Sequence, residues 1–180
     1  MSTGTQVEAG TWAIDKVHSG ARFSIEHNSA TAFTGSFKDI DAKLESGDDG
    51  LKISGSVKVE SIDLQDPDQT GHVLAPDFFD AERYPTAEYV ATAVNYEDGE
   101  AVVEGNLTLR GETKPLTVRG TIGEPFTDGY GNNRVPVTLG TTFDRTEYGL
   151  NWQMELPNGK PVLGNDVTVE VDLQLIQVTE

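Results

Sequence analysis

The chain has 180 residues, a length that suits one domain, and 36% of them are apolar, which is enough to build a hydrophobic core. Its 30 acidic residues outnumber 13 basic ones, for a net charge of −17. A surface of this sign repels phosphate backbones and anionic membranes, so no nucleic-acid partner is expected. The absence of cysteine excludes disulfides, thiol catalysis and iron–sulfur clusters.

The first residues, MSTGTQVEAGTW, contain neither the basic nor the apolar stretch of a secretory signal. No apolar run reaches the 18 residues that a membrane-spanning helix needs. We therefore expect a cytoplasmic protein without stable membrane insertion. Residues 1–10 are expected to form a flexible segment, and residues 11–178 a single domain.

The rest of the chain consists mainly of runs in which apolar and polar residues alternate, as in half-buried strands. Asp-Gly pairs at 49–50 and 98–99 separate such runs and predict hairpins. Five glycines inside the runs indicate sharp bends or close strand contacts, which favours a barrel over a sandwich. These glycines are Gly35, Gly55, Gly105, Gly120 and Gly140. The pattern predicts an all-β, antiparallel barrel of eight strands, wide enough for side chains or one small ligand.

The alternation stops between Asp63 and Pro85, where the chain reads HVLAPDFFDAERYP from His72 onward. We expect a short helical lid around residues 70–79, capped by Asp68 or Thr70, with Pro85 starting the next strand. Phe78 and Phe79 are adjacent and cannot point the same way. One is therefore expected to face the barrel interior, and the other to anchor the lid.

Catalytic and metal-binding motifs are not apparent. The chain contains no phosphate-binding glycine loop and no Gly-x-Ser-x-Gly elbow. Asp15, His18 and Ser19 are the residue types of a hydrolytic triad, but their spacing within one turn favours a hydrogen-bonded corner. His18, His27 and His72 lack metal-ligand spacing, so no metal site is predicted. Arg145 follows a predicted strand, and forms either an ion pair or a contact with a ligand head group.

Six segments together resemble, in order, the motifs of the YceI-like family. They are TWAIDKVHSGARFSIEH, FTGSF, HVLAPDFFDAERYPTAEY, GNLTLRGETKPLTV, FDRTEYGLNW and VLGNDVTVEVDL, and they extend from Trp12 to about Ile176. The resemblance implies a lipocalin-like barrel that holds a polyisoprenoid, either a polyprenyl chain or an isoprenoid quinone, without catalysis or another cofactor. The chain departs from the family at Gln69 and Thr70, where an Arg-Asp pair is usual, so the polar rim of its barrel is expected to differ.

The expected ligand-binding residues lie on the inward apolar faces or are polar groups suited to the barrel mouth. They are Phe23, Ile25, His27, Phe37, His72, Phe78, Phe79, Tyr89, Leu107, Leu109, Val137, Phe143, Arg145 and Trp152. The sequence leaves open whether these residues line a tunnel or fill a core. It also leaves open a lipid isomerase or cyclase, a stress-response protein with an incidental cavity, and a homodimer formed through exposed strand edges.

Overall fold

The computed structural model describes residues 7–179, in which twelve strands form one antiparallel sheet beside one α-helix and two short 3-10 helices. The elements are β1 (Gly10–Ile14), β2 (Gly20–His27), β3 (Thr31–Phe37), β4 (Ile40–Gly47), β5 (Gly50–Lys58), η1 (Val59–Ser61), β6 (Ile62–Asp63), α1 (Pro67–Leu74), β7 (Thr86–Glu97), β8 (Glu100–Leu109), β9 (Glu112–Ile122), β10 (Phe126–Thr127), β11 (Asn133–Asp144), η2 (Arg145–Tyr148) and β12 (Leu163–Gln177).

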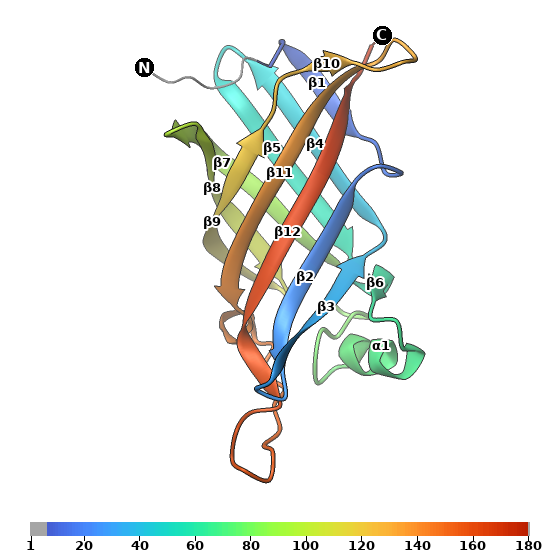
Figure 1. Cartoon of the computed structure of the whole chain (residues 1–180), viewed down its shortest axis with the longest axis vertical. Helices are drawn as coiled ribbons and strands as arrows, with labels where there is room; N and C mark the ends of the chain where they lie inside the picture. Colours follow the sequence, from blue (N-terminus) through green and yellow to red (C-terminus); the bar gives the residue numbers. More distant parts are fainter. Residues whose placement is uncertain (1–6, 180) are drawn as a thin grey trace.

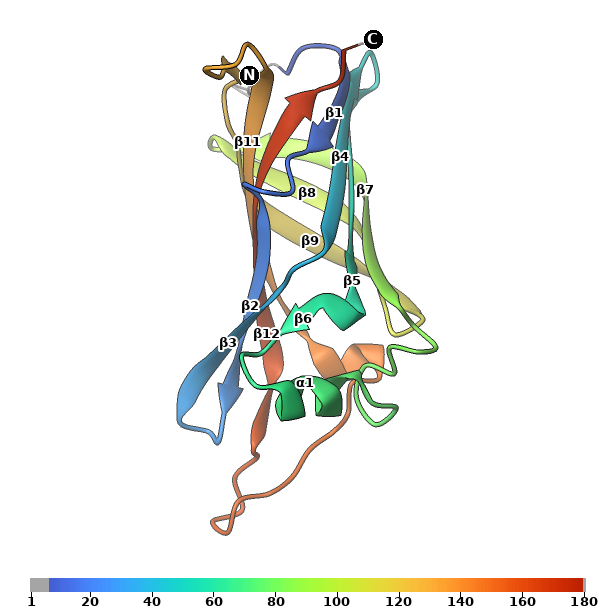
Figure 2. The same cartoon turned by 90° about the vertical axis from the view of Figure 1, so that its right-hand side faces the viewer.

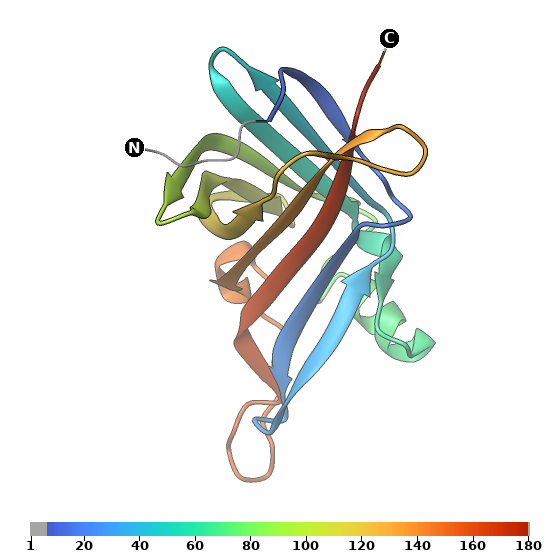
Figure 3. The same cartoon turned by 45° about the horizontal axis from the view of Figure 1, so that its top comes forward.

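Eight strands close the barrel, in the order β11-β9-β8-β7-β5-β4-β1-β12 and back to β11 (Figures 1 and 3). The ring closes because β11 pairs with β9 on one side and with β12 on the other. The predicted eight-stranded antiparallel barrel is therefore confirmed. The predicted hairpin at Asp98-Gly99 is also confirmed: both residues have positive φ, 50° and 84°, as a two-residue turn between twisted strands requires.

The barrel has two different halves. Near the chain termini, β1 lies between the end of β12 and β4. In the other half, β2 takes over the pairing with β12, and β3 pairs with the two-residue strand β6 instead of β4. α1 lies across this second end of the barrel (Figure 2). We call the half around β1 the closed half and the half beside α1 the open half.

The strand glycines mark close approaches between neighbouring strands. A Cβ atom at Gly120 would collide with the backbone carbonyl of Thr138 on β11, and one at Gly105 would collide with the carbonyl of Val90 on β7. In the open half, a Cβ at Gly35 would lie 2.6 Å from Cζ of Phe23. These contacts agree with the close packing that the sequence pattern indicates.

The closed half is filled by a packed hydrophobic core. Inward side chains from six of the eight ring strands meet there and are almost fully buried: Trp12, Leu44, Ala101, Val103, Ile122, Val135, Val137 and Leu175. The indole of Trp12 donates to the carbonyl of Glu8 at 3.2 Å, and Val7 packs against the same core. Of the segment expected to be flexible, residues 1–6 lie outside the described part. Val7 and Glu8 contact the barrel and Gly10 begins β1.

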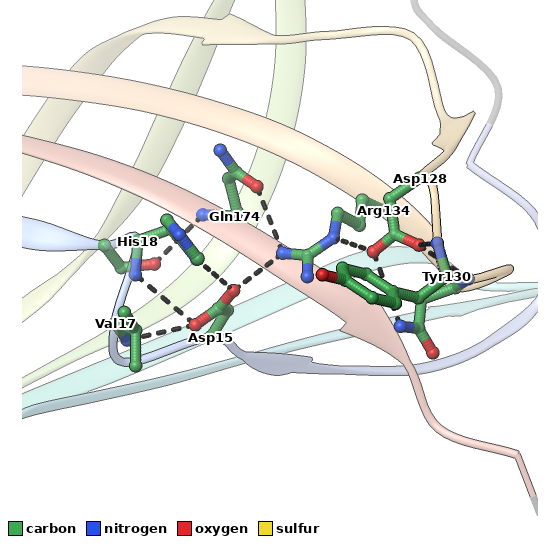
Figure 4. A network of polar contacts seen from close by, with 9 residues as sticks. Asp15, Val17, His18, Asp128, Tyr130, Arg134 and Gln174 are labelled. Carbon is green, nitrogen blue, oxygen red and sulfur yellow. Dashed lines mark hydrogen bonds and ion pairs between the residues drawn. The ribbon is translucent and has the colours of Figure 1, made fainter.

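A polar network closes the rim of this half (Figure 4). The guanidinium of Arg134 on β11 donates to Asp15 at 2.7 Å and to Asp128 at 2.6 Å, and all three side chains are nearly buried. Asp15 also accepts hydrogen bonds from the backbone amides of Val17 and His18. Arg134 holds the pKa values of both carboxyl groups well below their usual range. One cation therefore joins the β1–β2 corner to the β10–β11 loop.

The segment that contains Asp15, His18 and Ser19 is thus a structural corner, as the sequence favoured. The imidazole of His18 lies 2.8 Å from the Asp15 carboxylate, and Ser19 accepts a hydrogen bond from the amide of Gln174 on β12. These contacts hold the corner against the barrel.

The lid helix is real but begins earlier than expected. α1 covers Pro67–Leu74, and its N-cap is Asp66, which accepts from the amide of Asp68, so the prediction of Asp68 or Thr70 as the cap was wrong. Proline at the first helical position and an acidic cap fit the start of a helix well. Phe78 and Phe79 lie in the turns that follow the helix, not within it.

Candidate ligand cavity

The open half of the barrel encloses a cavity of about 590 Å³, within the range of small-molecule sites in proteins. Its walls come from the inner faces of the strands, and α1 and the following turn form part of its roof. The exposed residues Gln69 and His72 also line it, so the cavity reaches the surface beside α1. We call this region the mouth.

Most of the residues expected to bind a ligand line this cavity. They are Phe23, Ile25, His27, Phe37, His72, Phe78, Phe79, Tyr89, Leu107, Leu109, Phe143, Arg145 and Trp152. Val137 does not: it is 1% exposed within the packed core of the closed half, because β11 passes from one half to the other along its length. That placement corrects the expectation for Val137, while ligand contact by the others remains a prediction.

A row of aromatic rings crosses the cavity near its mouth. Ring centroids are 5.8 Å apart for Phe23 and Phe37, 6.5 Å for Phe37 and Phe79, 5.3 Å for Phe79 and Phe78, and 6.4 Å for Phe78 and Trp152. These separations are typical of favourable tilted and edge-on pairs. The row joins β2 and β3 on one side to the loop after η2 on the other.

Both phenylalanines of the lid turn line the cavity, which corrects the expectation that only one would face inward. Their second roles differ. Phe78 is 8% exposed and belongs to a buried cluster with Tyr148 and Leu150, whereas Phe79 is only partly buried and reaches toward Phe37. Phe78 is therefore the stronger anchor of the two.

Tyr89 lies deeper in the cavity wall. Its hydroxyl donates to the carbonyl of Leu116 at 2.8 Å and lies 3.2 Å from that of Val103. Burial raises the pKa of Tyr89 to about 12. Its ring occupies the space over Gly105, where a Cβ would lie 2.8 Å from Cζ of the tyrosine. The hydroxyl is thus bonded to the barrel wall, and the surface offered to the cavity is mainly apolar.

Arg145 is 1% exposed and lines the cavity, yet none of the described carboxylates forms an ion pair with it. Its guanidinium donates instead to three neutral oxygens: the carbonyl of Gly164 at 2.8 Å, the carbonyl of Leu150, and Oδ1 of Asn165 at 3.5 Å. Burial lowers the pKa of Arg145, and the nearby charge of Asp144 partly offsets this shift. The predicted ion pair is therefore not formed, and Arg145 joins η2 to the start of β12.

The three histidines lie on different elements of the fold. His18 belongs to the corner of the closed half, whereas His27 and His72 line the cavity. The ring of His72 stands edge-on to Trp152, with centroids 5.0 Å apart, and its Nε2 lies 3.4 Å from Asp77. The described residues contain no cluster of three or more potential metal ligands.

Several residues that line the cavity were not predicted from the sequence. Leu64 and Val73 come from the non-alternating segment, Leu150 and Val162 from loops, and Phe33 from a hairpin that extends past the barrel ring. Leu64, Val73, Leu150 and Val162 lie outside the strands, so alternation gave no signal for them, whereas Phe33 alternates with Gly35 and Phe37 on β3. The phenylalanine-rich lid motif, Arg145 and Trp152 were the indications that segments between strands contribute to the cavity.

Comparison with known proteins agrees with this geometry. The family model for the YceI-like domain matches residues 12–175, nearly the whole described chain. The chain belongs to the YceI-like family. A UPF0312 protein of Pseudomonas putida strain W619 is 32% identical over 152 residues, covering 81% of this chain and 79% of that protein. A UPF0312 protein of Staphylococcus epidermidis strain RP62A is 30% identical over 168 residues, covering 89% and 94%.

Two solved structures of low sequence identity share this fold. Burkholderia cenocepacia BcnA matches with a TM-score of 0.74 and 20% identity over 89% of this chain and 98% of its own. A polyisoprenoid binding domain from Saccharophagus degradans matches with a TM-score of 0.65 and 12% identity over 93% and 98%. Among the described residues no helix is long and apolar enough to cross a membrane. The cytoplasmic location and the homodimer remain predictions from the sequence.

Proposed function

We propose that this YceI-like protein binds a polyisoprenoid lipid, a polyprenyl chain or an isoprenoid quinone, and stores or carries it without chemical change. The apolar cavity in the open half carries this proposal. The family supports it, as does the polyisoprenoid binding described for the Saccharophagus degradans domain. Burial of apolar surface stabilises a complex by about 25 cal/mol per Å² removed from water. An apolar cavity therefore favours binding of a hydrocarbon chain.

The distribution of polar groups favours one orientation of the lipid. Gln69, His72 and Asp68 of α1 lie at the mouth, whereas Leu139, Leu173 and Val171 line the deeper part. Binding of an apolar tail is most favourable where it does not displace water from polar groups, because desolvating them costs free energy. We expect the tail to point toward the closed half and the head group to remain near α1, within reach of His27, His72 or Arg145.

Native mass spectrometry tests the proposal. Protein purified from its own source is expected to carry a prenyl lipid, and stripped protein to take up geranylgeraniol or a short-chain ubiquinone. Chromatography of the released lipid should recover it unchanged, with no cofactor added. A barrel that takes up neither lipid would contradict binding, and a converted lipid would contradict storage without catalysis.

Two substitutions on one strand provide a matched comparison. Ala87 on β7 lines the cavity, and Val90 on the same strand is 53% exposed. Ala87→Phe adds a ring to the cavity and is expected to reduce lipid uptake at least tenfold. Val90→Phe places the same ring on the outer face and should leave uptake unchanged. Equal uptake by both variants would show that the lipid binds elsewhere.

A further inference from the structure

The roof of the cavity is weakly held by its own contacts. α1 has eight residues, none of which is buried, and Gly71 lies within it. A helix this short is not stable alone in water, and an interior glycine weakens it further. Nevertheless His72 and Val73 of this helix line the cavity. Something outside the helix must hold it in place.

Two residues with unusual backbone angles bracket this roof. Gln65 before the helix has φ of 68° and Asp80 after the turn has φ of 52°, although neither is glycine. Left-handed conformations are unfavourable for glutamine and better tolerated by aspartate, and they concentrate at turns and at sites of conformational change. The segments on the far sides are fixed to the barrel: Ile62 and Leu64 are about 5% exposed before Gln65, and Tyr84 packs against Gly111 after Asp80. We call residues 65–80 the lid.

Arg110 is the side chain that fastens the lid to the barrel. It lies in the β8–β9 turn, where its Nε donates to the carbonyl of Phe78 at 2.9 Å and its Nη2 to the carbonyl of Pro76 at 3.1 Å. Both acceptors belong to the turn that places Phe78 and Phe79 in the cavity wall. Hydrogen bonds from a charged donor are stronger than neutral ones, so this pair adds to the attachment that the buried ring of Phe78 provides.

The side chain of Arg110 also lies close to two further segments at the mouth. The guanidinium lies 5.9 Å from the ring centroid of Tyr84, and a Cβ at Gly149 would be 3.2 Å from Nη1. Gly149 follows η2 and precedes the loop of Leu150 and Trp152. One guanidinium thus meets three mouth segments: the lid turn, the Tyr84 segment and the loop after η2. None of the described carboxylates forms an ion pair that would hold it away from them.

We propose that Arg110 is a positioning residue that latches the lid over the cavity, and that ligand enters and leaves when the lid opens about Gln65 and Asp80. Arg110 does not line the cavity, so it acts through Phe78 and the turn. The latch itself is a property of the free protein, and only its role in ligand exchange rests on the proposed lipid binding.

Hydrogen exchange tests the latch without any ligand. The amides of Phe78, Phe79 and Ala81 are bonded only to carbonyls of the lid, those of Ala75, Val73 and Leu74. Once released, so short a segment frays, so Arg110→Gln is expected to speed exchange of these amides about tenfold or more. Exchange in β8, β9 and β12 should not change.

Arg119→Gln is the matched control, because Arg119 is a half-exposed arginine on β9 whose ion-pair partners within residues 7–179 are Glu97 and Glu100 alone. It should leave lid exchange unchanged. Arg110→Lys keeps the positive charge but cannot donate to both carbonyls with the bidentate geometry of a guanidinium. It should give an intermediate rate of amide exchange in the lid. If Arg110→Gln leaves lid exchange unchanged, or speeds it equally throughout the barrel, the latch is overturned. If that variant fails to fold, the lysine variant decides between the same two outcomes.

Stopped-flow fluorescence then tests ligand exchange. Trp152 lies at the mouth, so a short-chain ubiquinone is expected to quench its emission on binding. Arg110→Gln should raise both the uptake and the release rate at least fivefold, and Arg119→Gln neither. If the uptake and release rates do not change although amide exchange in the lid becomes faster, the role of Arg110 in ligand exchange is overturned. Absence of quinone uptake by the unmodified protein would instead count against the proposed function, with the hydrogen-exchange result still deciding the latch.

Discussion

The two halves of this barrel share long strands such as β11 and β12, yet their inward side chains are arranged in opposite ways. In the closed half, Trp12, Leu44 and Val135 are fully buried against one another. In the open half, inward residues such as Phe23, Leu107 and Ala87 face a cavity. The comparison shows that alternation decides which side chains point inward, whereas the width between opposite walls decides whether they meet.

The sheet is arranged differently at the two ends of the barrel. In the closed half, β1 closes the ring by pairing with β12 and β4. In the open half, β3 turns away to pair with β6, and the gap is covered by the lid rather than by a ring strand. Aromatic rings at the mouth and small residues deeper in, such as Ala42 and Gly55, leave space between the walls.

Truncating one large side chain in each half should give the largest contrast in stability. Trp12→Ala leaves a void in a packed core and is expected to lower the free energy of unfolding by about 3–5 kcal/mol. Phe79→Ala enlarges an existing cavity, so we expect a loss below about 2 kcal/mol together with weaker lipid retention. Urea denaturation measures both. Equal losses would mean that the open half is packed as tightly as the closed one.

Replacing an alanine by a larger residue in each half should also give different losses of stability. Ala101 is fully buried in the closed half, so Ala101→Phe is expected to lower stability by about 1–3 kcal/mol or to prevent folding. Ala87→Phe has space available and should cost less than about 1 kcal/mol while blocking lipid uptake. Thermal melts of both variants, with and without geranylgeraniol, provide the measurement. A destabilised Ala87→Phe protein would place Ala87 in a filled core.

The strand glycines offer a finer comparison. A Cβ at Gly120 meets the rigid backbone of β11, so Gly120→Ala is expected to cost about 1–3 kcal/mol. A Cβ at Gly35 meets the ends of two side chains that line the cavity, Phe23 at 2.6 Å and Leu64 at 2.8 Å, so Gly35→Ala should cost less than Gly120→Ala and reduce lipid uptake. Chemical denaturation and lipid titration compare them. A larger loss for Gly35→Ala would contradict an open space beside Phe23.

The smallest expected effect depends on pH and concerns the rim of the closed half. Asp15 and Asp128 have pKa values lowered by Arg134 from an ordinary value of 3.8. Their stabilising contribution is complete above pH 4 and is lost as the pH falls through the folded-state values. Arg134→Gln should therefore be less stable than the unmodified protein at pH 7, with the difference narrowing below pH 4.

Arg119→Gln is the control for this pH dependence, since its partners Glu97 and Glu100 are exposed. Urea midpoints at pH 7 and pH 3 for the three proteins measure the effect. A difference between the Arg134→Gln and unmodified proteins that stays constant across this range would show that Arg134 acts through packing and not through the two carboxylates.

The sequence alone determined the all-β barrel, its main hairpins, the close approaches at glycines and the YceI-like family, because alternation, turn residues and short motifs are local signals. It also identified most of the residues that line the cavity, since strand alternation decides which side chains face inward. Tertiary structure alone decided that Val137 is core and Phe23 is cavity wall, because both are inward residues and only the spacing of opposite walls distinguishes them. The roles of Arg145 and Arg110 depend on carbonyl oxygens brought from distant segments, and no local pattern in the sequence encodes such contacts.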